Sequence, residues 1–137
     1  MVILRRRRRG RLRVYSVDER GMVRVPVVVE GSLGTAKYLG LVDTGSTYVI
    51  LPERDCANLG LVRDETHRKA LILTVKGETV ADLYSAVSVN VVDADLSVEN
   101  VEVLAKTVHG MPCILGMSFL RQIDWSFSKD KQEFTIR

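Results

Sequence analysis

From Val14 to its C-terminal end, the 137-residue chain consists of short runs rich in valine, isoleucine and threonine, with turn residues between them. β-Branched side chains fit the pleated surface of a strand, and turn residues at short intervals leave little room for long helices. The pattern therefore predicts an all-β domain over residues 14–137. Helix is confined to one or two short segments, predicted at residues 53–59 and 117–122.

Nine runs are predicted as strands. They cover residues 22–30, 36–42, 48–51, 69–75, 79–91, 96–105, 113–115, 125–127 and 133–136. Pro26 has no N–H to donate to a ladder, which places its strand at a sheet edge or a bulge. The segment Gly31-Ser32-Leu33-Gly34 predicts the turn into the second strand. Pro52 and Gly60 bracket the first helix as its start and stop signals.

Residues 1–13 are predicted to form a basic arm outside the domain. Seven arginines contribute +7 there, so the formal net charge of +3 leaves −4 for residues 14–137. They are Arg5, Arg6, Arg7, Arg8, Arg9, Arg11 and Arg13. A mildly acidic body argues against nucleic-acid binding over the whole fold, and any contact with a polyanion would be local to Arg5–Arg9. A run of like charges is more often a solvated tail.

Val2, Ile3 and Leu4 are too few, and lie on the wrong side of the arginines, for the apolar part of a secretory signal, which needs roughly 7–15 residues. No apolar run reaches the ~18 residues of a membrane-spanning helix. We therefore expect a cytoplasmic protein with no membrane partner. Cys56 and Cys113 have neither a CxxC pair nor a neighbouring histidine. They are expected to be buried reduced thiols, and no metal or cofactor is expected.

The tripeptide Asp43-Thr44-Gly45 lies between two apolar runs, so it is predicted to be a loop that joins two buried strands. Alone the tripeptide is weak evidence, because aspartate and glycine are common in turns. Two further features give it weight. Ile114-Leu115-Gly116 is an apolar-apolar-glycine motif near the C-terminal end, and Lys76-Gly77 marks a predicted hairpin midway between the two motifs.

Together these motifs resemble the retropepsin-like aspartic peptidases over about residues 22–136. The segments LPERDCANLGL, after the loop, and CILGMSFL, near the end, are similar to the cellular rather than the viral members. The resemblance implies a closed acid-protease β-barrel with a flap hairpin, active as a twofold homodimer. It also implies a peptide or unfolded-protein substrate.

Peptide hydrolysis by water requires one group that takes a proton from water and another that gives a proton to the amide. Two carboxylates that share one proton supply both, because like charges at close range cannot both stay ionised. The sequence holds one Asp-Thr-Gly and no close variant of it. Two chains must therefore meet at Asp43, which an isologous twofold dimer allows.

The resemblance also assigns roles to the neighbours of Asp43. Thr44 would lock the two loops together across the twofold axis, and Gly45 would let the backbone pass close to substrate. Ser46 stands where viral members usually carry alanine. Its hydroxyl is expected to donate a hydrogen bond to the Asp43 carboxylate, which would favour the charged form and give a more acidic rate profile.

Residues outside the loop are assigned support or substrate binding. Ile114, Leu115 and Gly116 would pack beneath the loop and hold it rigid. A hairpin would form the flap and pair with an extended peptide as an added strand. The candidate flap residues are Val75, Lys76, Gly77 and Glu78.

The chain also departs from the viral pattern. Thr47-Tyr48 stand where viral members carry two aspartates, so acidic contacts to the substrate backbone are missing. Met117 replaces a viral arginine that ties loops together across the dimer, and Arg121 is a candidate substitute. If the arm is ordered, we expect it to form a strand against Phe134 and Ile136 of the partner chain.

Two alternatives stay open. The chain could be a non-catalytic dimeric module of the same fold that binds extended peptides, although intact Asp43, Thr44 and Gly45 argue against a pure binder. It could also be a nucleic-acid-associated β-domain that uses the arginine arm. In that case its affinity for nucleic acid would fall steeply with salt.

Overall fold

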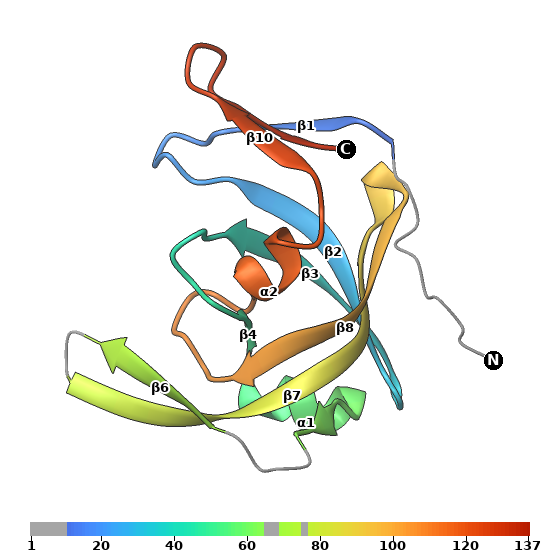
Figure 1. The fold of residues 1–137 in the computed structure, drawn as a ribbon, viewed down its shortest axis with the longest axis vertical. Helices are drawn as coiled ribbons and strands as arrows, with labels where there is room; N and C mark the ends of the chain where they lie inside the picture. The colour runs from blue at the N-terminus through green and yellow to red at the C-terminus, as the bar shows by residue number, and fades with distance from the viewer. Residues whose placement is uncertain (1–10, 65–68, 75–76) are drawn as a thin grey trace.

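The computed structural model describes residues 11–64, 69–74 and 77–137, and within these ranges the chain is mostly β (Figure 1). The strands are β1 (Arg13–Ser16), β2 (Arg24–Gly31), β3 (Gly34–Val42), β4 (Val49–Leu51), β5 (Val62–Arg63), β6 (Lys69–Thr74), β7 (Gly77–Val91), β8 (Leu96–Ala105), β9 (Ile114–Leu115), β10 (Trp125–Ser128) and β11 (Glu133–Ile136). The helices are α1 (Glu53–Leu59), η1 (Val92–Ala94) and α2 (Met117–Leu120). The predicted all-β class with two short α-helices is confirmed.

Six strands close into a barrel in the order β2-β3-β9-β4-β8-β7. Pairing of β2 with β7, from Val28↔Asn90 to Glu30↔Ser88, closes the ring. Residues on β2 alternate between inside and outside as a strand's period of two requires, with Val25, Val27 and Val29 buried. The predicted closed barrel is therefore confirmed.

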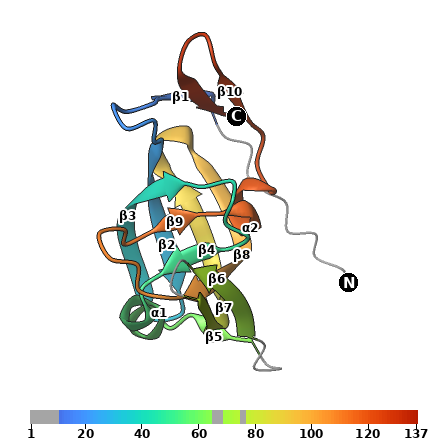
Figure 2. The same ribbon diagram turned by 90° about the vertical axis from the view of Figure 1, so that its left-hand side faces the viewer.

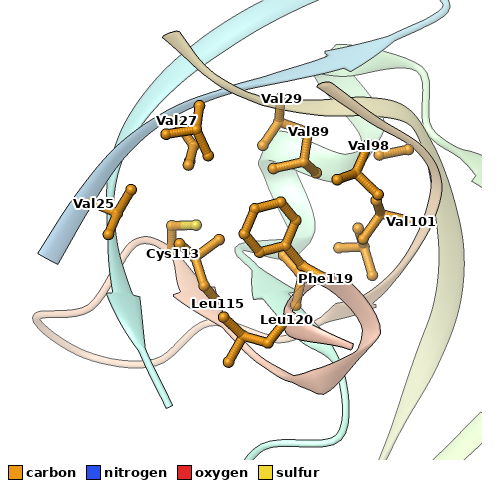
Figure 3. Packing of buried hydrophobic residues seen from close by; sticks show 14 of the residues in the cluster. Val25, Val27, Val29, Val89, Val98, Val101, Cys113, Leu115, Phe119 and Leu120 are labelled. Carbon is orange, nitrogen blue, oxygen red and sulfur yellow. The ribbon is translucent and has the colours of Figure 1, made fainter. Parts of the chain in front are cut away.

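Helix α2 points the Phe119 side chain into the interior of this barrel (Figure 3). Phe119 and Leu120 have no exposed surface, and neither has Leu115 of the adjoining strand β9. Figure 3 shows the Phe119 ring pointing among valines from the surrounding strands. Burying such side chains stabilises a fold by roughly 1.5–3 kcal/mol each, so α2 is held firmly in place.

Helix α1 begins and ends where its flanking residues predict. Pro52 precedes it, and Gly60 ends it in the left-handed conformation, with φ 67° and ψ 41°. The Gly60 amide donates to the carbonyls of Cys56 and Ala57. α1 packs on β3, where the Tyr38 hydroxyl donates to Asp55 Oδ2 at 2.7 Å. Burial, together with this carboxylate, raises the pKa of Tyr38 well above its usual value.

The proline prediction for β2 also holds. Pro26 pairs with Leu39 of β3. The pairing of β2 with β7 covers only residues 28–30. Pro26 therefore lies in the part of β2 that pairs with β3 but not with β7. The missing N–H of proline is tolerated at such an edge.

A second, smaller sheet joins the two ends of the described chain in the order β1-β11-β10. The arm was expected to form a strand against Phe134 and Ile136 of the partner chain, but its first ten residues lie outside the described residues. In the described part, β1 pairs with β11 of its own chain, with Tyr15↔Phe134 and Arg13↔Ile136 in register. Pairing within one chain costs no association entropy, which favours it over an exchange between subunits. The Arg11 amide also donates to the Ala94 carbonyl, so contact with the barrel reaches Arg11.

Both cysteines are free and buried, as expected. Burial raises the pKa of the Cys113 thiol to about 12. Burial, with the nearby Asp55 carboxylate, raises the pKa of the Cys56 thiol to about 12 as well. No helix within the described ranges is long and apolar enough to cross a membrane.

Candidate active site

The Asp-Thr-Gly segment forms the loop between β3 and β4, as predicted. Asp43 directly follows β3, and its side chain is exposed. The Asp43 amide donates to the Leu115 carbonyl at 3.0 Å. The Gly45 amide donates to Asp43 Oδ1 at 2.9 Å, and the Ser46 amide donates to the Asp43 carbonyl at 3.1 Å. These three bonds fix the backbone of the loop and the orientation of its carboxylate.

Strand β9 lies directly beneath this loop, between the two strands that the loop connects. Leu41↔Ile114 and Val42↔Leu115 pair in parallel on one side, and Ile50↔Ile114 pair antiparallel on the other. Ile114 and Leu115 are therefore found where the sequence predicted supporting residues.

Gly116 lies so close to the loop that no larger residue fits. A Cβ at this position would lie 2.2 Å from the Tyr48 carbonyl oxygen and 2.6 Å from that of Ser46. Helix α2 begins at the next residue. The Met117 and Ser118 amides donate to the Ser46 and Thr47 carbonyls at 2.7 and 2.8 Å. The first amides of a helix have no partner within the helix, and here the loop supplies their acceptors.

The expected hydrogen bond from Ser46 to the Asp43 carboxylate is not formed. The Ser46 hydroxyl donates to the Tyr48 carbonyl at 2.8 Å instead. A hydroxyl has one proton to donate, so Ser46 stabilises the backbone conformation of the loop and donates no hydrogen bond to the Asp43 carboxylate. Thr44 and Gly45 are exposed at the tip of the loop, beside Asp43.

Residues 23–122 of the chain match the family described as "gag-polyprotein putative aspartyl protease". The chain belongs to this family. The matched range holds both the Asp-Thr-Gly loop and the Ile114-Leu115-Gly116 motif that supports it. The resemblance to retropepsin-like aspartic peptidases that these sequence motifs indicated is thereby confirmed.

A solved structure also has the same fold as this chain. The crystal structure of a retropepsin-like aspartic protease from Rickettsia conorii matches with a TM-score of 0.67. The match covers 93% of this chain and 90% of that one at 22% sequence identity, a level at which the fold is the common property. A search among curated proteins finds no match.

The hairpin of β6 and β7 projects from the barrel on the side where the loop 43–48 also lies (Figures 1 and 2). Its strands pair from Lys69↔Asp82 to Thr74↔Gly77. Gly77, with φ 114°, and Glu78 are exposed at the start of β7. The other two candidate flap residues, Val75 and Lys76, lie outside the described residues.

Arg121 is the predicted candidate to replace the viral arginine that ties loops together across the dimer. It is exposed, and its Nη2 atom lies 3.8 Å from Glu102 Oε1 of the same chain. Its described ion pair is thus within the subunit. Within the described ranges, no group of three or more His, Cys, Asp or Glu side chains is arranged to hold a metal ion.

Ser118 is a site residue that the sequence did not identify. It is 2% exposed and hydrogen-bonded to both β4 and β8. The available signal was a serine inside the apolar segment CILGMSFL. A polar residue among core residues needs hydrogen-bond partners, and here those partners are far away in sequence.

Proposed function

We propose that this chain is a homodimeric aspartic endopeptidase that hydrolyses extended or unfolded polypeptides with water activated between two Asp43 carboxylates. The observation that carries this proposal is the exposed Asp43 side chain on a loop fixed by backbone bonds to β9 and α2. A carboxylate that is both accessible and rigidly held suits proton transfer to and from a bound substrate. Membership of an aspartyl protease family supports the same chemistry.

In the proposed dimer, the twofold axis passes between the two Asp43 side chains, with a water molecule held by both. One carboxylate is ionised and takes a proton from this water as it attacks the peptide carbonyl carbon. The other is protonated and gives its proton toward the scissile amide.

Thr44 and Gly45 take supporting roles in this proposal. Thr44 is exposed beside Asp43, which leaves its hydroxyl accessible to the loop of a second subunit. Gly45 orients the Asp43 carboxylate through its amide, at 2.9 Å. A side chain at Gly45 would bring a Cβ within 3.2 Å of the same carboxylate oxygen. Glycine thus keeps the approach to Asp43 open.

The hairpin of β6 and β7 supports the proposed substrate class. It has an exposed start of β7 at Gly77 and Glu78 and lies on the same side of the molecule as the loop between β3 and β4 (Figure 2). An extended peptide could pair with such a hairpin as an added strand, through main-chain hydrogen bonds. Folded substrates cannot present their backbone in this way, so extended or unfolded segments are the proposed substrates.

The test is cleavage of a denatured protein and of a mixed peptide library by the wild type and by Asp43→Asn, from about pH 3 to pH 8, a range that brackets titration of a shared carboxylate pair. Fold and dimer content of both proteins are measured first. Cleavage by the wild type that disappears in the variant supports the proposal. A stable wild-type dimer that binds peptides and cleaves none of them would favour the binding module instead.

A further inference from the structure

Two buried polar side chains occur among the described residues, Ser88 and Ser118. Ser118 is 2% exposed and lies in the first turn of α2, directly after the segment that supports the Asp43 loop. A buried hydroxyl is costly unless its hydrogen-bonding capacity is used. The partners of Ser118 therefore indicate why a serine stands among the core residues of this helix.

The Ser118 hydroxyl links β4, which starts where the Asp43 loop ends, to its neighbour β8. It accepts a hydrogen bond from the Val49 amide at 2.8 Å and donates one to the Glu102 carbonyl at 2.7 Å. β4 and β8 run parallel, with Val49↔Val103 as their first paired residues. The hydroxyl thus forms an additional link at the start of this pairing, because it can accept one hydrogen bond and donate another at the same time.

This link fixes the C-terminal end of the loop, where it joins β4. The loop is held at its beginning by the Asp43 amide on the Leu115 carbonyl. At its end, Ser118 contacts it twice, through its amide to Thr47 and through its hydroxyl to Val49. The next residue, Phe119, is fully buried in the barrel (Figure 3). Ser118 therefore connects the end of the loop to the core.

We infer that Ser118 is a positioning residue for Asp43, acting through the backbone of residues 47–49 and without contact to substrate. The inference rests on the proposed peptidase function. Catalytic groups must be held within about 0.5 Å of their productive geometry, and a displacement of about 1 Å can cost on the order of 100-fold in rate. In a twofold dimer, one substitution displaces both loops, so the two carboxylates move relative to each other.

The test compares Ser118→Ala with Ser118→Thr and with a matched control, Ser88→Ala. Ser88 is the other buried serine, and its hydroxyl donates to Glu30 Oε2 at 2.9 Å and accepts from the Asn90 amide group at 3.0 Å. It links β7 to β2 and not to the active loop. The control thus removes a comparable buried hydroxyl from the same barrel.

At equal fold and dimer content, Ser118→Ala is expected to lower kcat by about 10- to 100-fold with KM changed by less than about twofold. Ser118→Thr keeps the hydroxyl and should recover most of kcat, and Ser88→Ala should keep kcat within about twofold of the wild type. A kcat for Ser118→Ala within twofold of that for Ser88→Ala would overturn the inference. If the alanine variant does not fold, Ser118→Cys, which keeps the shape with a weaker hydrogen bond, takes its place.

A second readout does not depend on activity. Amide hydrogen exchange at Gly45 and Ser46 reports order in the loop, because both amides donate to Asp43. Exchange at both should be faster in Ser118→Ala and unchanged in Ser88→Ala, and equal exchange in the two variants would overturn the inference. If the wild type cleaves no substrate, the proposed function fails, and the exchange data still decide whether Ser118 holds the loop.

Discussion

The proton of the Ser46 hydroxyl serves one acceptor at a time, and the Tyr48 carbonyl holds it at 2.8 Å. Asp43 receives its described hydrogen bond from a backbone amide, that of Gly45. The described hydrogen bond to the Asp43 carboxylate therefore comes from the main chain of this loop. The Ser46 side chain, close to Asp43, stabilises the loop, and the backbone supplies the hydrogen bond to the carboxylate.

Substitution of Ser46 by alanine should leave the acidic limb of the pH–rate profile in place. The lost hydrogen bond to Tyr48 should lower the free energy of unfolding by about 1 kcal/mol, the usual contribution of such a bond. Both are measurable on one preparation, by cleavage rates between about pH 3 and pH 6 and by urea unfolding. An acidic limb that moves upward would show that Ser46 donates to Asp43 after all.

The two buried thiols should make the protein less stable at alkaline pH. Burial raises the pKa of Cys56 and of Cys113 to about 12 in the folded chain, from 9.0. Above pH 9 the unfolded chain loses thiol protons that the folded chain keeps, so stability falls from about pH 9 to pH 12. At pH 10 this amounts to about 1.4 kcal/mol per thiol.

Urea unfolding at pH 8 and pH 10 checks this, with the wild type beside Cys113→Ala. The alanine variant is less stable at both values, because it leaves a cavity. Its loss between pH 8 and pH 10 should be smaller than that of the wild type. Equal losses in the two proteins would mean that the thiol at position 113 has an ordinary pKa in the fold.

Among the elements, α2 and β9 together determine where the active loop lies. β9 pairs with the strands on both sides of the loop, and α2 donates two amides to it. Both elements are anchored by fully buried side chains, Leu115 and Phe119. The loop is therefore supported from beneath by two elements that are anchored in the core.

Gly116 is the point of closest approach between these elements and the loop. Gly116→Ala should lower the free energy of unfolding by about 1–3 kcal/mol, as overpacking does, because its methyl group would meet the Tyr48 and Ser46 carbonyls. It should also lower kcat, since the backbone that carries Asp43 must shift.

A useful control for this substitution is Gly21→Ala. Gly21 has φ 77° and open space around its Cβ position, so its variant suffers backbone strain alone, about 1 kcal/mol. Unfolding and cleavage are compared in both proteins. If Gly116→Ala loses no more stability or activity than Gly21→Ala, the close packing of α2 against the loop is not what holds Asp43.

Most elements could be predicted from sequence because their signals are local. Helix 53–59 and strand 96–105 have the predicted bounds, since proline, glycine and the apolar pattern mark them within a few residues. β1 was missed as a strand of its own chain, because its partner β11 lies at the other end of the sequence. β5 has two residues, too few for a pattern to show.

The residues of the candidate site also divide into those with a local sequence signal and those without one. Asp43 and Ile114–Gly116 form motifs that can be read from residue types, and the structure brings them together. The choice of Ser46 between two acceptors a few residues apart depends on the turn of the backbone, which residue types do not specify. Ser118 and Val49 are 69 positions apart, so no local pattern connects them.

At the level of the whole molecule, one chain presents half of the proposed active site. The loop with Asp43 and the hairpin of β6 and β7 face the same side (Figure 2). The sequence contains one Asp-Thr-Gly, and the proposed reaction needs two carboxylates at close range. Each active dimer must then contain two intact chains.

The most direct measurement of this claim is the activity of a fixed amount of wild type mixed with increasing amounts of Asp43→Asn, after exchange of subunits. By mass action, an equal amount of the variant should reduce cleavage to about one half, and a ninefold excess to about one tenth, because mixed dimers carry one competent carboxylate. Cleavage that stays at the level of the wild type alone, although mixed dimers have formed, would contradict the claim that two Asp43 side chains act together.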